Sequence, residues 1–171
     1  MILRTEQPED YQTVYDVVKR AFSSAQSSDG NEQDLVNALR KSSAFLPQLS
    51  LVAEVDGKVV GHILFTKVQI GNDGEALALA PLSVLPEYQK QGIGTALIHQ
   101  GHAVAKELGY HYSIVLGSED YYPRFGYLPA EAFGIRSPFA VPSKNFMACK
   151  ISENAPAVSG VVKYAKEFGI E

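Results

Sequence analysis

The sequence predicts a single α/β (α+β) domain over residues 1–171, in which a mixed, mostly antiparallel twisted sheet is flanked by helices. Three observations predict this fold class. Apolar residues recur at helical spacing near the N-terminus and in residues 92–108, three apolar runs between residues 49 and 84 are separated by short glycine turns, and no internal repeat or linker divides the chain. A chain of 171 residues is long enough for one core without cross-links and short for two ordinary domains.

The first part of the chain predicts a short strand followed by two helices. Residues Met1–Thr5 alternate between apolar and polar types, and Gln7–Asp10 offers a proline and acidic residues for a first helical turn. Apolar residues then recur at helical spacing as far as Phe22, before a small, polar loop over Ser23–Gly30. A second helix is predicted over Asn31–Lys41, since its leucines and valine fall on one face.

The middle of the chain predicts an antiparallel meander of three strands. The segments Leu49–Val55, Lys58–Ile70 and Glu75–Val84 are rich in Val, Ile, Leu and Phe. They are separated by Asp56-Gly57 and by Gly71–Gly74, and Asp-Gly between two apolar runs is a strong hairpin signal. We therefore expect three strands that pair in chain order.

The second half begins with the longest predicted helix, over Gly92–Leu108, which Gly109 terminates. A short apolar strand is predicted over Tyr112–Leu116. Beyond it, Phe146–Ile151 is a further strand candidate, and Val158–Tyr164 is a short apolar segment.

Composition excludes several classes of function. Fifteen Lys and Arg against nineteen Asp and Glu give a net charge of -4, and no run of basic residues occurs, which argues against nucleic-acid binding. Cys149 is the single cysteine and cannot form an intramolecular disulfide, and with four histidines it makes no zinc motif, so we expect no metal. No apolar run has the length of a signal peptide or of a membrane span, so a cytoplasmic protein without membrane contact is expected.

The segment that carries chemistry is a strand, a tight turn with two glycines, and the start of the long helix. A helix N-terminus presents backbone N–H groups without internal partners and the positive end of the helix dipole. Gly92 and Gly94 remove side chains where an anion must approach the backbone, so a diphosphate ligand is predicted. A dinucleotide fingerprint would need glycine in place of Leu97, and a P-loop would need lysine before Thr95, so both nucleotide motifs fit poorly.

Gln89-x-x-Gly92-x-Gly94 resembles the Gln/Arg-x-x-Gly-x-Gly/Ala signature of the GNAT superfamily, the acyl-CoA-dependent N-acyltransferases. The resemblance extends upstream to Val84 and Pro86, and downstream to Tyr122–Tyr127, which is similar to the Tyr-x-x-x-Gly-Phe/Tyr segment of that superfamily. The order of the predicted elements matches as well. Within the superfamily, a group of small bacterial N-acetyltransferases is similar in three further runs, Ala80–Val84, Val115–Gly126 and Val141–Met147.

The resemblance implies a GNAT fold that is splayed between the fourth and fifth strands, and acetyl-CoA as co-substrate. Pro81 lies inside an apolar strand, where it cannot donate a ladder hydrogen bond, and a splay at this point would free backbone groups for the amides of pantetheine. The cofactor-binding residues that the resemblance implies are Leu82, Ser83, Val84, Gln89, Lys90, Gln91, Gly92, Ile93, Gly94, Thr95, Ala96 and Gly117.

The reaction implied is direct transfer of an acetyl group, in a ternary complex, to a primary amine of a small molecule or peptide. Tyr122 matches the position of the general acid of the family, and a phenol with an ordinary pKa of about 10 is protonated at neutral pH. Members often carry a glutamate in the strand before the phosphate turn, but this strand reads Leu77–Ala80. The general base that deprotonates the amine is therefore open, and a chain of waters could also serve. The candidate residues are Glu32, His62, Glu119 and Asp120. Glu75 stands too early in the strand to serve as the base.

Other features have plainer interpretations. His62 is expected to be a partly buried, hydrogen-bonded histidine, His99 and His102 exposed helix residues, and Cys149 a small buried apolar residue. The missing strand carboxylate leaves a non-catalytic acyl-CoA-binding domain as the alternative function. The acceptor wall is expected from residues 23–39 and from the chain beyond residue 130, and the net negative charge favours cationic acceptors. Both a monomer and a homodimer are compatible with the sequence.

Overall fold

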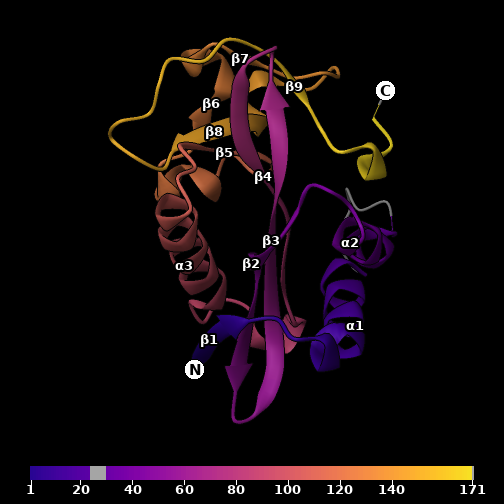
Figure 1. The fold of residues 1–171 in the computed structure, drawn as a ribbon. Coiled ribbons are helices and arrows are strands. Elements are labelled where there is room, and N and C mark those ends of the chain that lie inside the picture. Colours follow the sequence, from indigo (N-terminus) through magenta and orange to yellow (C-terminus); the bar gives the residue numbers. More distant parts are fainter. Residues whose placement is uncertain (24–29, 171) are drawn as a thin grey trace.

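The structure is a computed structural model that describes residues 1–23 and 30–170. Most of the predicted loop at Ser23–Gly30 therefore lies outside the described residues. Within the described ranges, one sheet forms the centre of the molecule (Figure 1), with the strand order β1-β2-β3-β4-β5-β8-β6, and β9 pairs with β3 and β7. Its strands are β1 (Ile2–Thr5), β2 (Phe45–Val55), β3 (Lys58–Ile70), β4 (Gly74–Val84), β5 (Tyr112–Leu116), β6 (Leu128–Pro129), β7 (Ile135–Arg136), β8 (Phe146–Lys150) and β9 (Gly160–Lys163).

The helices cover the two faces of the sheet. Figure 1 shows α1 (Tyr11–Phe22) and α2 (Glu32–Arg40) on one face and α3 (Ile93–Glu107) on the other. All three helices lie where the sequence predicts them, and the predicted meander is formed by β2, β3 and β4, which pair antiparallel. The predicted α/β fold is confirmed.

One strand boundary differs from the prediction, because β2 begins at Phe45 rather than at Leu49. Pro47 lies in this first part of the strand. Strand β1 pairs only with the later part of β2, Leu51 to Glu54, so the first part of β2 has an open edge on that side. Proline is tolerated at such an edge because no ladder hydrogen bond is lost.

The face covered by α3 is packed closely against the sheet. Gly101 lies directly over the ring of Phe65, and an added Cβ would overlap that ring. Leu97, Ile98 and Ala105 of the same helix are completely buried. Packing at this density fixes where the N-terminal end of α3 stands relative to β4.

A buried polar network joins α2 to the sheet on the other face. The guanidinium of Arg40 donates to both carboxylate oxygens of Glu6, at 3.1 and 2.6 Å, and the two side chains are 7% and 1% exposed. Ser50 Oγ donates to Glu6 Oε1 at 2.8 Å and lies 3.0 Å from His62 Nε2. Because a buried charge is tolerated only with such partners, this network positions α2.

The sheet splays where the sequence predicts it. Strands β4 and β5 pair in parallel at Leu77 with Ser113 and at Ala78 with Ile114, and the pairing ends there. On the other side of β4, residues 80 and 81 together oppose a single residue of β3, which is a β-bulge. A bulge bends the strand that carries the extra residue, so β4 turns away from β5 at Pro81, whose preceding peptide bond is cis.

Candidate active site

The turn between β4 and α3 is built around a left-handed glycine. Gly92 precedes the helix with φ of 85°, and no heavy atom lies within 4 Å of the position a Cβ would take, so the space beside it is open. Lys90 also has a positive φ, of 63°. The side chain of Gln89 closes the turn by donating to the carbonyl of Val84 at 3.1 Å. The residues of the predicted motif therefore shape the end of the helix.

The N-terminus of α3 presents unpaired backbone donors. The N–H of Ala96 donates to the carbonyl of Gly92 at 3.0 Å and makes the first hydrogen bond of the helix. The N–H groups of Gly92, Ile93, Gly94 and Thr95 find no acceptor in the described part of the chain. Four donors at the positive end of a helix dipole can hold a phosphate group, and Ala96, which was predicted among them, is already engaged in the helix.

A cavity of about 700 Å³ lies over this end of the helix. Lys90 and Arg124 supply positive charge to it, and Arg124 stacks over the ring of Tyr121 at 4.5 Å. The predicted residues that line the cavity are Leu82, Val84, Gln89, Lys90, Gly92, Ile93, Gly94 and Thr95. The donors, the charge and the shape together suit an elongated diphosphate ligand.

The remaining predicted binding residues do not line this cavity. The side chain of Ser83 is 1% exposed and, by the alternation of the strand, faces away from Leu82 and Val84. Gln91 donates through its side chain to the carbonyl of Glu87 at 3.4 Å. Gly117 lies at the end of β5, where its N–H donates to the carbonyl of Asn145 at 2.9 Å.

Two tyrosines that the sequence reasoning did not single out, Tyr88 and Tyr121, also line the cavity. Tyr121 Oη lies close to Gly94, since an added Cβ there would stand 2.7 Å from it. The signal that could have found Tyr121 is its place directly beside the predicted acid.

Tyr122, the predicted acid, is packed beneath the end of β5. Its ring lies edge-on to those of Tyr121 and Tyr127, with centroids 5.1 and 5.7 Å away, and leaves no room for a Cβ at Gly117. Burial raises the pKa of Tyr122 well above its ordinary value. Its hydroxyl makes no hydrogen bond to any described residue, so this phenol is a protonated donor without a partner.

A second cavity, of about 600 Å³, lies on the other side of the bend in β4. It is bordered by Ala78 to Ala80 of β4, by Ile114 and Leu116 of β5, and by residues of α2 and of the C-terminal segment. Figure 1 shows the C-terminal segment running beside α2. This is the region from which the sequence predicted the acceptor wall.

The candidate bases occupy different places. Glu32 lines the second cavity. His62 is completely buried, more than expected, and burial lowers its pKa to about 4. Glu119 accepts a hydrogen bond from Asn145 at 2.5 Å, and its pKa is lowered by hydrogen bonds to its own backbone and to that asparagine. Asp120 is exposed.

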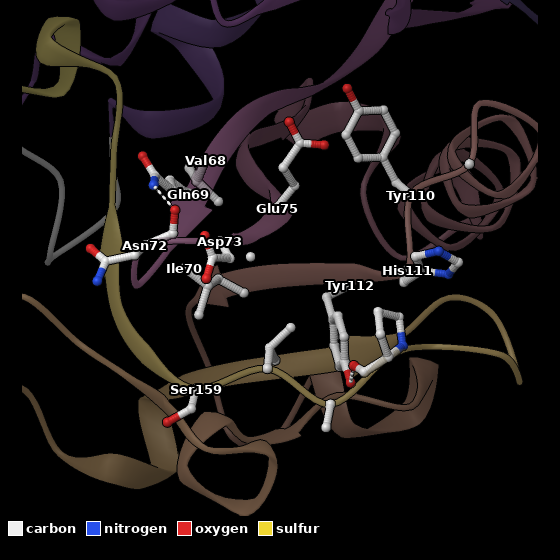
Figure 2. A pocket seen from close by; sticks show the side chains of 15 residues that line it. Val68, Gln69, Ile70, Asn72, Asp73, Glu75, Tyr110, His111, Tyr112 and Ser159 are labelled. Carbon is white, nitrogen blue, oxygen red and sulfur yellow. Dashed lines mark hydrogen bonds between the residues drawn. The ribbon is translucent and has the colours of Figure 1, made fainter.

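A third cavity, of about 840 Å³, lies at the opposite end of the sheet (Figure 2). Asp73, Glu75, Tyr110 and His111 stand around it, and the C-terminal end of α3 leads to it through Gly109. Carboxylates and the negative end of a helix dipole repel phosphate, so this larger cavity does not suit a diphosphate. Glu75 lies here, away from the bend in β4, as its early position in the strand suggested.

The remaining histidines and the cysteine do not line either of the two cavities beside the bend in β4. His102 is half-buried rather than exposed as predicted, because its face of α3 meets Tyr127, whose hydroxyl lies 2.9 Å from His102 Nε2. His99 is exposed and Cys149 is buried, as predicted. Among the described residues, no three His, Cys, Asp or Glu side chains lie close enough to share a metal ion.

No helix within residues 1–23 and 30–170 is both long and apolar enough to cross a membrane.

Comparisons with known proteins agree with this geometry. Residues 11–127 match the model of the acetyltransferase (GNAT) family. The chain is 36% identical over 152 residues to the uncharacterized N-acetyltransferase YjhQ of Escherichia coli K12, which covers 86% of this chain and 81% of that protein. It is 32% identical over 171 residues to the uncharacterized N-acetyltransferase YhbS of the same strain, with 98% of both chains covered.

Solved structures show the same fold. The crystal structure of YhbS from Escherichia coli in complex with CoA is 30% identical, with a TM-score of 0.88 over 98% of this chain and 91% of that chain. A GNAT acetyltransferase from Brucella melitensis in complex with acetyl-CoA is 34% identical, with a TM-score of 0.81 over 98% of this chain and 97% of that chain. The chain belongs to the acetyltransferase (GNAT) family and is an N-acetyltransferase.

Proposed function

We propose that the protein transfers the acetyl group of acetyl-CoA directly to a primary amine while both substrates are bound. One observation carries the proposal: a single bent strand borders two cavities. Leu82 and Val84 of β4 line the cavity at the phosphate turn, and Ala78 to Ala80 line the cavity beside α2. A thioester held along the first and an amine held in the second would meet at Pro81, and such positioning supplies much of the acceleration of a bimolecular reaction.

The residues around the phosphate turn would hold the co-substrate. The unpaired N–H groups of residues 92–95 would take the diphosphate, with Lys90 and Arg124 beside it. The edge of β4 that leaves β5 after Ala78 exposes backbone groups to the amides of the pantetheine arm. A backbone N–H at or near Leu82 would donate to the thioester carbonyl as charge develops on its oxygen.

Tyr122 would protonate the leaving thiolate. Its hydroxyl carries its proton at neutral pH, because even the ordinary pKa of a phenol is about 10 and burial raises it further, and no described residue competes for that proton. A proton is also lost from the attacking ammonium before the reaction. Among the four candidate bases, Glu32 lines the cavity beside α2, which favours it over the buried His62 and over Glu119 and Asp120 beyond β5.

The binding half of the proposal is tested by calorimetric titration with acetyl-CoA. Wild type should bind, and Gly92→Glu should not, since a carboxylate would stand in the open space beside the N-terminus of α3. Equal binding by both proteins, or no binding by wild type, would refute the claim that the phosphate turn binds acetyl-CoA.

The chemical half is tested by detecting free CoA thiol with a panel of primary amines. Tyr122→Phe should lower kcat by about 10²-fold or more without weakening acetyl-CoA binding, as expected for a proton donor. Tyr110→Phe, beside the cavity of Figure 2, is the matched control and should keep wild-type turnover. Unchanged turnover in Tyr122→Phe would refute the acid assignment. Binding of acetyl-CoA without thiol release from any of the amines would refute transfer to a primary amine.

A further inference from the structure

The cavity beside α2 combines two kinds of surface that restrict its ligand. Three carboxylates line it, and within the described part of the chain no lysine, arginine or histidine does. Its remaining walls are mostly apolar. The acidic residues are Glu32, Asp34 and Glu167, and the larger apolar and aromatic ones are Leu35, Leu79, Ile114, Leu116, Phe139, Tyr164, Phe168 and Ile170.

The aromatic residues form a continuous wall that is supplied by the C-terminal part of the chain. The ring of Tyr164 is stacked with that of Phe139, with centroids 6.3 Å apart, and lies 5.1 Å from that of Phe168. The turn that holds Phe168 contacts α2, so this wall faces the helix that carries two of the carboxylates. Leu116, at the end of β5, is 50% exposed and adds apolar surface next to the bend of β4.

The carboxylates are available to a ligand to different degrees. Asp34 Oδ1 accepts a hydrogen bond from the hydroxyl of Tyr15 at 3.1 Å. Glu167 makes no hydrogen bond or ion pair with any described residue, although it is partly buried. A partly buried carboxylate without a partner gains from a cation, and aromatic ring faces also attract cations.

From these surfaces, and resting on the function proposed above, we infer that the acceptor is an arylalkylamine: a primary amine on a short alkyl chain that ends in an aromatic ring and carries no carboxylate. The ring would pack against Phe139, Tyr164 and Phe168, while the ammonium group would approach the bend of β4 past the carboxylates. An amino acid would bring its own carboxylate toward three others. The cavity therefore excludes free amino acids by repulsion.

The inference is tested with three probes that differ by one feature each, with thiol release measured on the full-length protein. 2-Phenylethylamine should be the best substrate. Phenylalanine adds a carboxylate and should have a kcat/KM lower by about 10- to 100-fold or more, from like-charge repulsion. n-Butylamine lacks the ring and should be poorer by a similar factor through a higher KM, since the packing of a buried ring is lost.

Two variants connect the selectivity to the cavity. Glu167→Gln should reduce the ratio of kcat/KM for 2-phenylethylamine to kcat/KM for phenylalanine by about tenfold. The matched control is Glu75→Gln, which removes the same charge at the cavity of Figure 2 and should leave the ratio unchanged. Phe168→Leu should reduce the ratio of kcat/KM for 2-phenylethylamine to kcat/KM for n-butylamine.

The outcomes separate this inference from the proposed function. Turnover of all three amines with similar kcat/KM, or equal effects of Glu167→Gln and Glu75→Gln, would overturn the arylalkylamine class and leave direct acetyl transfer standing. Acetyl-CoA binding without turnover of any amine would overturn both.

Discussion

His62 should make the fold sensitive to mild acid. The imidazole is completely buried, and burial lowers its pKa from 6.5 to about 4, with a further lowering by Arg40 that a neighbouring Glu6 opposes. Ser50 Oγ donates to Glu6, so it accepts the hydrogen bond from His62 Nε2–H, and Nδ1 is then an unprotonated nitrogen without a partner. The folded protein holds this histidine neutral.

The pH dependence follows from the two pKa values. In the unfolded chain the imidazole takes up a proton near pH 6.5, but in the folded protein it does so only near pH 4. Between these values the unfolded state binds more protons, so stability falls as the pH falls. Moving from pH 7 to pH 5 should cost about 2 kcal/mol from this group alone, because each unit of pKa difference corresponds to about 1.4 kcal/mol.

The assay is urea unfolding at pH 7 and at pH 5 of wild type and of His62→Gln. The glutamine amide can still donate to Ser50 but does not titrate. Titrating groups far from His62 act equally in both proteins and cancel in the comparison. Wild type should therefore lose about 2 kcal/mol more than the variant over this pH interval. Equal losses in the two proteins would refute the argument that His62 is held neutral by burial.

Two further substitutions test the packing of α3 and the buried ion pair of α2. Gly101→Ala should destabilise the protein by about 1–3 kcal/mol in urea unfolding, even though alanine favours a helix, because the added methyl overlaps the ring of Phe65. A neutral or stabilising result would contradict the close packing of α3. Arg40→Met should cost about 3–5 kcal/mol at pH 7, since it leaves the Glu6 carboxylate buried without its cation. A loss below about 1 kcal/mol would mean that water reaches Glu6 after the substitution.

Much of the architecture could be predicted from the sequence because it depends on local signals. Hairpin glycines, apolar periodicity and the glycine turn before α3 act within a few residues. The splay was implied by the family resemblance, with which Pro81 agrees because proline cannot donate to a ladder. The long-range pairings were harder. The sequence carries no local sign that β9 pairs with β3, or that His102 meets Tyr127, because both depend on how distant segments pack.

The candidate site also has one part that depends on local sequence and one part that depends on long-range packing. The phosphate turn is one contiguous segment, so the family resemblance could name its residues together, and their role in binding the co-substrate stays a prediction. The cavity beside α2 is lined by five separate parts of the chain, so its carboxylates and rings could only be grouped once the fold was known. The role of Glu32 stayed open for the same reason, because nothing in its own helix distinguishes it from Asp34.

The hydroxyl of Tyr127 stands between the two halves of the proposed machinery. It lies 2.9 Å from His102 Nε2 on α3 and 2.7 Å from Ser113 Oγ on β5. One end of α3 carries the phosphate turn, and one end of β5 leads into Gly117, which lies against the ring of Tyr122. The spacing between the proposed anchor of the co-substrate and the proposed proton donor is thus maintained from inside the core, so we expect that a substitution remote from both ligands can misalign the proposed reaction without touching either of them.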